Sequence, residues 1–118
     1  MIKRFILCLT LLTFSFSSAF SASGFIHGQN ICGKNVALWR KTHGLAVPKF
    51  PASSFSWKSL RRSAPHYGVV GFTYRKGGGH VFISLGNGQC LNPSARQQNW
   101  VKKPCSSIYP GKVKYWFN

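Results

Sequence analysis

The chain contains no aspartate and no glutamate, although it carries 16 lysines and arginines. A chain with this charge balance repels itself and is attracted to polyanions such as cell walls, nucleic acids or acidic lipids. The missing carboxylates also exclude several kinds of site. A two-carboxylate glycosidase, a Ser-His-Asp triad, a Walker-type Mg²⁺ site and an EF-hand all require acidic side chains. Any catalysis must therefore use Cys, His, Ser, Tyr, Lys, Asn or backbone amides.

The first 22 residues, MIKRFILCLTLLTFSFSSAFSA, have the three-part pattern of a secretory signal peptide. Lys3 and Arg4 precede a short apolar run, and small residues follow near Ala19 and Ala22, with cleavage after Ala19 favoured. The run is short for a membrane span, which needs roughly 20 apolar residues; a retained anchor is the alternative. We expect a secreted or periplasmic protein with a single domain over residues 23–118 and no membrane span after the leader is removed.

A helix is predicted over ICGKNVALWRKTHG, with Asn30 as its N-cap and Gly44 as its terminating glycine. Four residues of this segment recur at helical spacing and should form one face. They are Cys32, Val36, Trp39 and His43. A second, short helix over SSFSWKSLRRS could be capped by Ser54 or Ser56.

The second half of the chain has the texture of β-structure. GVVGFTYR, HVFISL, QCLNP and KVKYWF read as strands, separated by the glycine-rich turns KGGG and GNG. One helix followed by three or four antiparallel strands predicts an α+β domain with the helix packed on a small sheet.

Three cysteines remain after leader removal, and an odd count in an exported protein suggests one disulfide and one free thiol. Cys90 and Cys105 flank one loop and are the natural pair, which would stabilise the fold by about 3 kcal/mol. Cys32 is then the free thiol. It lies in the first turn of the predicted helix, where unpaired N–H groups and the helix dipole favour a thiolate, and its own N–H could bind an oxyanion.

A thiolate nucleophile needs a base, and His80 at the start of the HVFISL strand is the candidate. If GNG is a three-residue loop, Leu85 pairs with Gln89, and Asn92 lies opposite Phe82 and diagonal to His80. The sheet then holds a Cys-His-Asn set with Cys32. If the loop has two residues, Asn92 points to the other face.

The same register argues against the other candidates. Cys90 would lie about 13 Å along the strand from His80. His43 is far from Cys32 along its helix, and His27 and His66 lie in loops. No C-x₂-C or H-x₃-H spacing occurs, so we predict neither a metal site nor a cofactor.

The chain has a cysteine-led helix, the GVVGFTYR strand, and the GGGHVFIS strand with a polar residue on the next strand. This order resembles the NlpC/P60 and CHAP cysteine peptidases. The resemblance implies a papain-like α+β fold and cleavage of peptide or amide bonds in bacterial peptidoglycan. It also implies a triad of Cys32, His80 and Asn92. Family members sometimes place an upstream tyrosine near the oxyanion hole. That tyrosine is absent here, and Gln29 or Asn30 would take its place.

Two alternatives to a cysteine hydrolase remain at this point. A non-catalytic envelope-binding or antimicrobial protein would act through its charge, and its attachment would be salt-sensitive. A secreted ribonuclease would use two histidines and a lysine. The expected partner is peptidoglycan or another anionic envelope polymer, with no specific nucleic acid.

Overall fold

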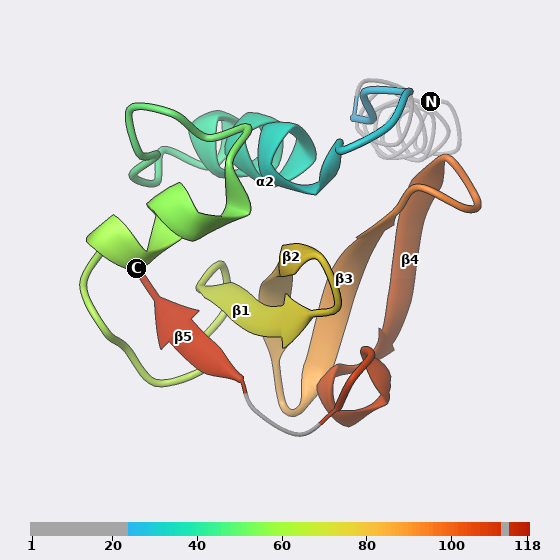
Figure 1. Ribbon diagram of the computed structural model, residues 1–118. Helices are drawn as coiled ribbons and strands as arrows, with labels where there is room; N and C mark the ends of the chain where they lie inside the picture. The colour runs from blue at the N-terminus through green and yellow to red at the C-terminus, as the bar shows by residue number, and fades with distance from the viewer. Residues whose placement is uncertain (1–23, 112–113) are drawn as a thin grey trace, which may run out of the picture.

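The computed structural model describes residues 24–111 and 114–118. The predicted leader and its cleavage sites at Ala19 and Ala22 lie outside these residues. Within them, one α-helix and two 3₁₀ helices accompany a five-stranded antiparallel sheet (Figure 1). This confirms the expected α+β class and the helix packed on a sheet. In the part of the chain described, no helix is both long and apolar enough to cross a membrane.

The sheet has the strand order β4-β3-β2-β1-β5. The first four strands follow one another as successive hairpins, and the last strand returns to pair with β1. Of the segment predicted as the last strand, Tyr115–Phe117 forms β5. The strand β4 was not expected, because most of its side chains are at least partly exposed at the sheet edge and give little alternation. The elements in chain order are α2 (Cys32–Thr42), η1 (Ser54–Ser59), β1 (Val70–Arg75), β2 (Gly78–Gly86), β3 (Gln89–Ser94), β4 (Asn99–Pro104), η2 (Cys105–Ser107) and β5 (Tyr115–Phe117).

The helix α2 begins and ends for different reasons. At its end, Gly44 has a φ of 69°, which confirms it as the terminating glycine. At its start, the N-cap is Ile31 and no side chain caps the helix, so the prediction of Asn30 as N-cap was wrong. Asn30 instead adopts a left-handed conformation with a φ of 53°, which turns the chain so that Ile31 is buried at the cap position.

The short predicted helix is a 3₁₀ helix preceded by Ser53, so neither Ser54 nor Ser56 is its N-cap. The Ser56 hydroxyl donates instead to the carbonyl of Ser53 at 2.7 Å. This helix contributes Trp57, which is fully buried and donates its indole N–H to the Pro51 carbonyl at 3.0 Å. The buried indole anchors η1 against the sheet.

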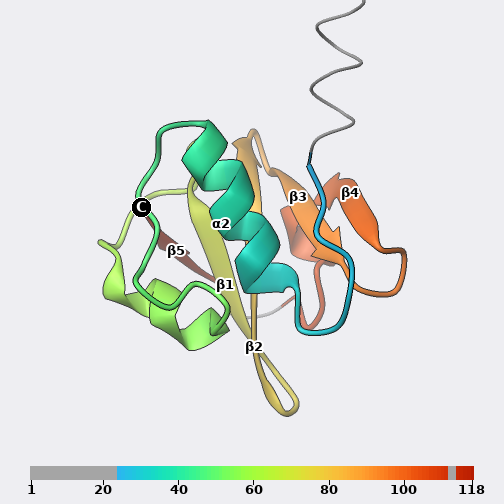
Figure 2. The same ribbon diagram turned by 90° about the horizontal axis from the view of Figure 1, so that it is seen from above.

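The two faces of the sheet carry different clusters. Val81 and Ile83 point toward α2, where they pack with Val36 and Trp39, and Figure 2 shows α2 lying across that face. The alternating residue Phe82 points to the opposite face, because side chains alternate along a strand. That second face holds a cluster of Phe82, Cys90, Cys105 and Ile108, with Trp116 packed against it.

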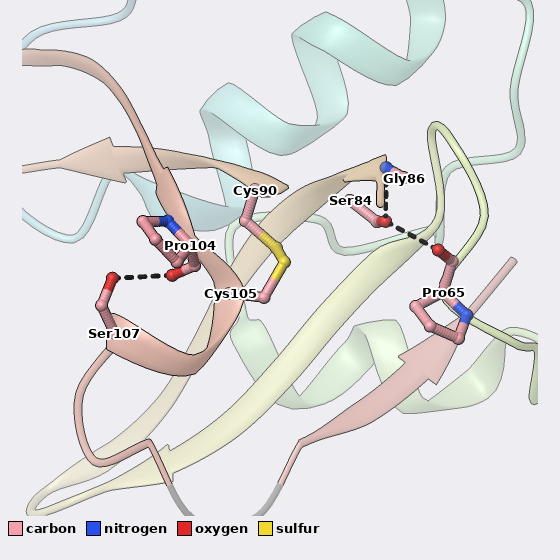
Figure 3. The surroundings of a disulfide bond; sticks show 7 residues. All are labelled: Pro65, Ser84, Gly86, Cys90, Pro104, Cys105 and Ser107. Carbon is pink, nitrogen blue, oxygen red and sulfur yellow. Dashed lines mark hydrogen bonds between the residues drawn. A yellow bond between two sulfur atoms is a disulfide. The ribbon is translucent and has the colours of Figure 1, made fainter. Parts of the chain in front are cut away.

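The predicted disulfide is confirmed: Cys90 and Cys105 are joined, with their Cα atoms 5.0 Å apart. Figure 3 shows the bond linking β3 to η2, near Ser84, whose hydroxyl donates to the Pro65 carbonyl at 3.0 Å. Cys32 is the free cysteine of the described residues. A disulfide in a domain of this size is compatible with an extracellular location.

The turn between β2 and β3 has two residues, Asn87 and Gly88, with φ values of 53° and 76°. Positive φ at both positions is typical of the tight hairpin turn that matches the twist of a sheet. Gly86 therefore pairs with Gln89, and the predicted pairing of Leu85 with Gln89 was wrong.

A β-bulge at Leu85 then changes the outcome of that short turn. Beyond the bulge, Ser84 pairs with Cys90. Continuing this register places Asn92 opposite Phe82, as the three-residue loop would have done. The extra residue in the bulge compensates for the shorter turn, and Asn92 stays on the face that was predicted.

Arg40 shows how the fold accommodates a buried cation without any acidic residue. Its guanidinium is fully buried and donates to the carbonyls of Ala46 at 2.9 Å and Gly68 at 2.7 Å, and to the side-chain oxygen of Asn118 at 3.0 Å. Burial lowers the pKa of Arg40. Backbone and amide oxygens thus replace the carboxylate that usually accompanies a buried arginine.

Candidate functional site

The segment before α2 is held in place by residues of the β3–β4 hairpin, far along the chain. The Gln98 side chain accepts from the Gly28 N–H at 2.7 Å and donates to its carbonyl at 2.9 Å. The indole of Trp100 donates to the Gly24 carbonyl at 2.6 Å. Together, these bonds fix the approach of the chain to Cys32.

Asn35 holds the same segment from inside the helix. Its buried side chain accepts from the Ile26 N–H at 2.6 Å and donates to the carbonyls of Ile26 and Ile31. Asn35 lies one turn beyond Cys32 on α2. The first turn of the helix is therefore positioned by side-chain bonds on both sides of the cysteine.

His80 and Asn92 meet as predicted. His80 Nε2 lies 2.6 Å from Asn92 Oδ1, and the two residues are only 5% and 9% exposed. An amide oxygen accepts but cannot donate, so the hydrogen must lie on His80 Nε2. In the neutral ring, Nδ1 then carries the lone pair that can accept a proton.

The surroundings of His80 keep its ring neutral. Burial, followed by the positive charge of Arg75, lowers the pKa of His80 from 6.5 to about 4. The hydrogen bond to Asn92 acts in the opposite direction, and the charge of Lys103 adds a smaller decrease. At neutral pH the imidazole is therefore a proton acceptor rather than a cation.

A pocket of about 180 Å³ is lined by both the predicted nucleophile and the predicted base. It lies at the start of α2, where Cys32 and His80 are both part of its wall. Among the described residues, no hydrogen bond joins the Cys32 thiol to His80. The wall consists of Asn30, Ile31, Cys32, Arg75, Gly79, His80, Pro93 and Ala95.

Cys32 and His80 reach this pocket from different faces of the sheet. His80 alternates with Val81, so its side chain shares the disulfide face of the sheet with Phe82, and the two rings lie 5.8 Å apart. Cys32 is carried by the helix on the other face. The pocket lies near the start of β2, and its wall includes Gly79.

Of the three residues predicted to bind the oxyanion, two line the pocket and one does not. Cys32 and Asn30 line the pocket, whereas Gln29 is exposed in the preceding bend. The Cys32 N–H belongs to the first residue of α2 and so has no partner within the helix.

Arg75 is the charged residue of the pocket wall, and it was not among the site residues predicted from the sequence. Arg75 pairs with Gly78 at the turn of the β1–β2 hairpin, and its Nε donates to the Tyr109 carbonyl at 3.1 Å. Counting the hairpin register outward from His80 would have found it, because Thr73 pairs with His80 and Arg75 lies two residues further. It places a positive charge within the pocket wall.

The remaining histidines lie elsewhere. His43 stacks on Trp39 at the end of α2, with the ring centroids 3.7 Å apart. His27 and His66 are exposed in loops. In residues 24–111 and 114–118, no group of three or more His and Cys side chains could hold a metal ion.

Comparison with known proteins gives no match: no protein-family model, no curated protein and no solved structure is significantly similar to this chain.

Proposed function

We propose that the chain is a secreted cysteine hydrolase of papain-like type that cleaves peptide or amide bonds of bacterial peptidoglycan. The observation that carries the proposal is the hydrogen bond from His80 Nε2 to Asn92, beside a pocket whose wall includes Cys32. A free thiol at a helix start, a neutral imidazole and an amide that orients the ring are the three groups this chemistry needs.

In the proposed reaction, His80 Nδ1 takes the proton of the Cys32 thiol as the sulfur attacks the amide carbonyl carbon. The Cys32 N–H donates to the oxyanion of the tetrahedral intermediate. His80 then gives its proton to the leaving nitrogen, the C–N bond breaks, and a thioester to Cys32 remains. Water, deprotonated by His80, attacks the thioester, and the returned proton restores the thiol.

Arg75 supports a substrate that carries a carboxylate near the scissile bond. An imidazole with a pKa of about 4 is a weak base at neutral pH. A carboxylate bound next to Arg75 would oppose its charge and raise the pKa of His80 toward the working pH. Peptide stems of peptidoglycan contain such carboxylates, and the positive charge of the whole chain favours accumulation on an anionic envelope.

We expect Arg75→Gln to remove the preference for acidic substrates. The variant should cleave a carboxylate-bearing peptide at least tenfold more slowly than the parent protein, because the charge that binds the carboxylate is lost. Cleavage of the same peptide with the carboxylate amidated should change little. Measuring kcat/KM for both peptides tests this, and an equal loss on both would contradict the assigned role.

The proposed function is tested with the domain freed of its leader and incubated with purified peptidoglycan. Released fragments are separated and identified by mass spectrometry. The parent protein should release peptides, and Cys32→Ala and His80→Gln should not. Cys90→Ala and His66→Gln are the matched controls for loss of a cysteine and of a histidine, and both should retain activity at a temperature where they remain folded.

A second readout does not depend on guessing the substrate. With saturating acetate present as the carboxylate beside Arg75, alkylation of Cys32 by iodoacetamide should be slower in His80→Gln than in the parent protein across neutral pH. The reason is that the base that accepts the thiol proton is missing. Equal rates, together with no fragment release, would overturn the hydrolase. Salt-sensitive attachment to the envelope that persists in Cys32→Ser would then indicate a non-catalytic binder, which the net charge of +16 favours.

A further inference from the structure

A second pocket lies at the edge of the sheet away from β3 and β4. It is formed between η1 and the strands β1 and β5. Its volume is about 370 Å³, within the range of roughly 300–1,000 Å³ that is common for small-ligand sites. It shares no wall residue with the Cys32 pocket. Its wall consists of Lys58, Leu60, Arg62, Tyr74, Tyr115 and Phe117.

Aromatic rings continue from this pocket along the surface. Tyr74 is 44% exposed, and its ring centroid lies 6.2 Å from that of Tyr115 on one side and 6.2 Å from that of Phe55 on the other. Phe55, on η1, is 48% exposed. Phe72 lies beneath this row, 5.0 Å from Tyr74, and is fully buried. The row therefore presents ring surface to solvent above a packed base.

Cations are interleaved with these rings. Lys58 Nζ lies 5.1 Å from the Tyr74 ring centroid and donates to the Tyr74 hydroxyl at 2.6 Å. The Arg62 guanidinium lies 5.0 Å from the Tyr115 ring centroid and 5.7 Å from that of Phe117. Because the chain has no Asp or Glu, no acidic side chain can neutralise either cation. The charge at this pocket is available to an anion from outside the protein.

We propose that this aromatic and basic surface binds single-stranded nucleic acid without sequence preference. Proteins that bind single strands combine positive charge along the backbone with aromatic rings on which bases stack. Arg62 offers a planar donor pair that fits a phosphate, and Lys58 adds a point charge beside it. A sulfated or carboxylated glycan would match the charges but has no flat base to stack on Tyr74 or Phe55.

The aromatic part is tested by fluorescence anisotropy with a short labelled oligothymidylate at low salt. Tyr74→Leu should weaken binding about tenfold, because one base loses its stacking partner, while Tyr74→Phe keeps the ring and should bind like the parent protein. Heparin, a polyanion without bases, should bind both variants equally. Equal oligonucleotide affinity in Tyr74→Leu and Tyr74→Phe would overturn the proposal.

The ionic part needs a control for general charge. The double variant Lys58→Gln/Arg62→Gln should reduce the slope of log affinity against log salt by about 1.4, roughly 0.7 for each lost phosphate contact. Lys41→Gln/Lys102→Gln changes two exposed lysines away from the pocket by the same charge and should leave the slope nearly unchanged. An equal decrease in both pairs would show diffuse attraction and contradict a site.

This surface does not depend on the hydrolase. Cys32→Ala should bind the oligonucleotide like the parent protein, since Cys32 lines the other pocket and not this one. Loss of fragment release with unchanged oligonucleotide binding would therefore concern only the hydrolase. Wall polymer that displaces the oligonucleotide and binds Tyr74→Leu and Tyr74→Phe equally would assign the surface to charge alone and overturn the proposal.

Discussion

Replacing Gly33 with alanine is expected to lower the free energy of unfolding by about 3 kcal/mol. Gly33 is buried in the first turn of α2, directly after Cys32. A Cβ atom at this position would lie 1.9 Å from the carbonyl oxygen of Pro51, and a backbone carbonyl cannot move aside as the end of a side chain can. In a helix, the same substitution ordinarily stabilises by up to about 1 kcal/mol, so the close approach reverses its sign.

Thermal and urea unfolding followed by circular dichroism measure this effect. A loss of about 3 kcal/mol corresponds to a decrease in Tm of more than about 10 °C for a domain of this size. Lys34→Ala is the matched control, because it introduces alanine at the next position of the helix, which is exposed. This variant should change stability little. A Gly33→Ala protein as stable as its parent would show that α2 does not pack on the Pro51 loop as described.

The folded protein is also expected to lose about 3 kcal/mol of stability as the pH falls from about 6.5 to about 4. The pKa of His80 is about 4 in the folded state and 6.5 ordinarily. Between these values the unfolded chain binds a proton that the folded chain does not. The free energy of unfolding therefore rises with pH through this window, and the stability is lost on acidification.

Because the chain has no acidic side chains, the acid loss of stability can be assigned to histidine more directly than in most proteins. Acid unfolding of most proteins includes the protonation of many carboxylates, but no Asp or Glu is present here. Urea unfolding at several pH values should show the acid loss in the parent protein and in His66→Gln, and a much smaller loss in His80→Gln. An unchanged acid loss in His80→Gln would contradict the burial of a neutral ring at this site.

The local chemistry of a few residues was sufficient to predict much of the fold. Gly44 ends α2 because glycine adopts the left-handed backbone conformation without steric cost, and a single glycine in the sequence is enough to predict this. The pairing of Cys90 with Cys105 followed from an odd cysteine count and a short loop. The contact of His80 with Asn92 was predicted from strand alternation together with a three-residue turn. The turn has two residues, and the contact forms because the bulge at Leu85 restores the register.

The features that were missed depend on tertiary packing. The bulge at Leu85 corrected a turn that was one residue shorter than predicted, and neither change is marked in the local sequence. Asn30 is a good N-cap residue by type, but the burial of Ile31 decided which residue caps the helix. Arg75 reaches the pocket through the register of the β1–β2 hairpin, which pairs Thr73 with His80, and that register was not worked out from the sequence.

The bonds that fix the approach to Cys32 also set the order in which the site can assemble. Gly24 and Gly28 are held by Trp100 and Gln98, partners 76 and 70 residues further along the chain. A nascent chain that ends at Ser94, the last residue of β3, lacks both partners, so Gly24 and Gly28 are not yet held even if α2 has already formed. We therefore expect the thiol to reach its final geometry late in folding, after the β3–β4 hairpin has closed over the entry segment.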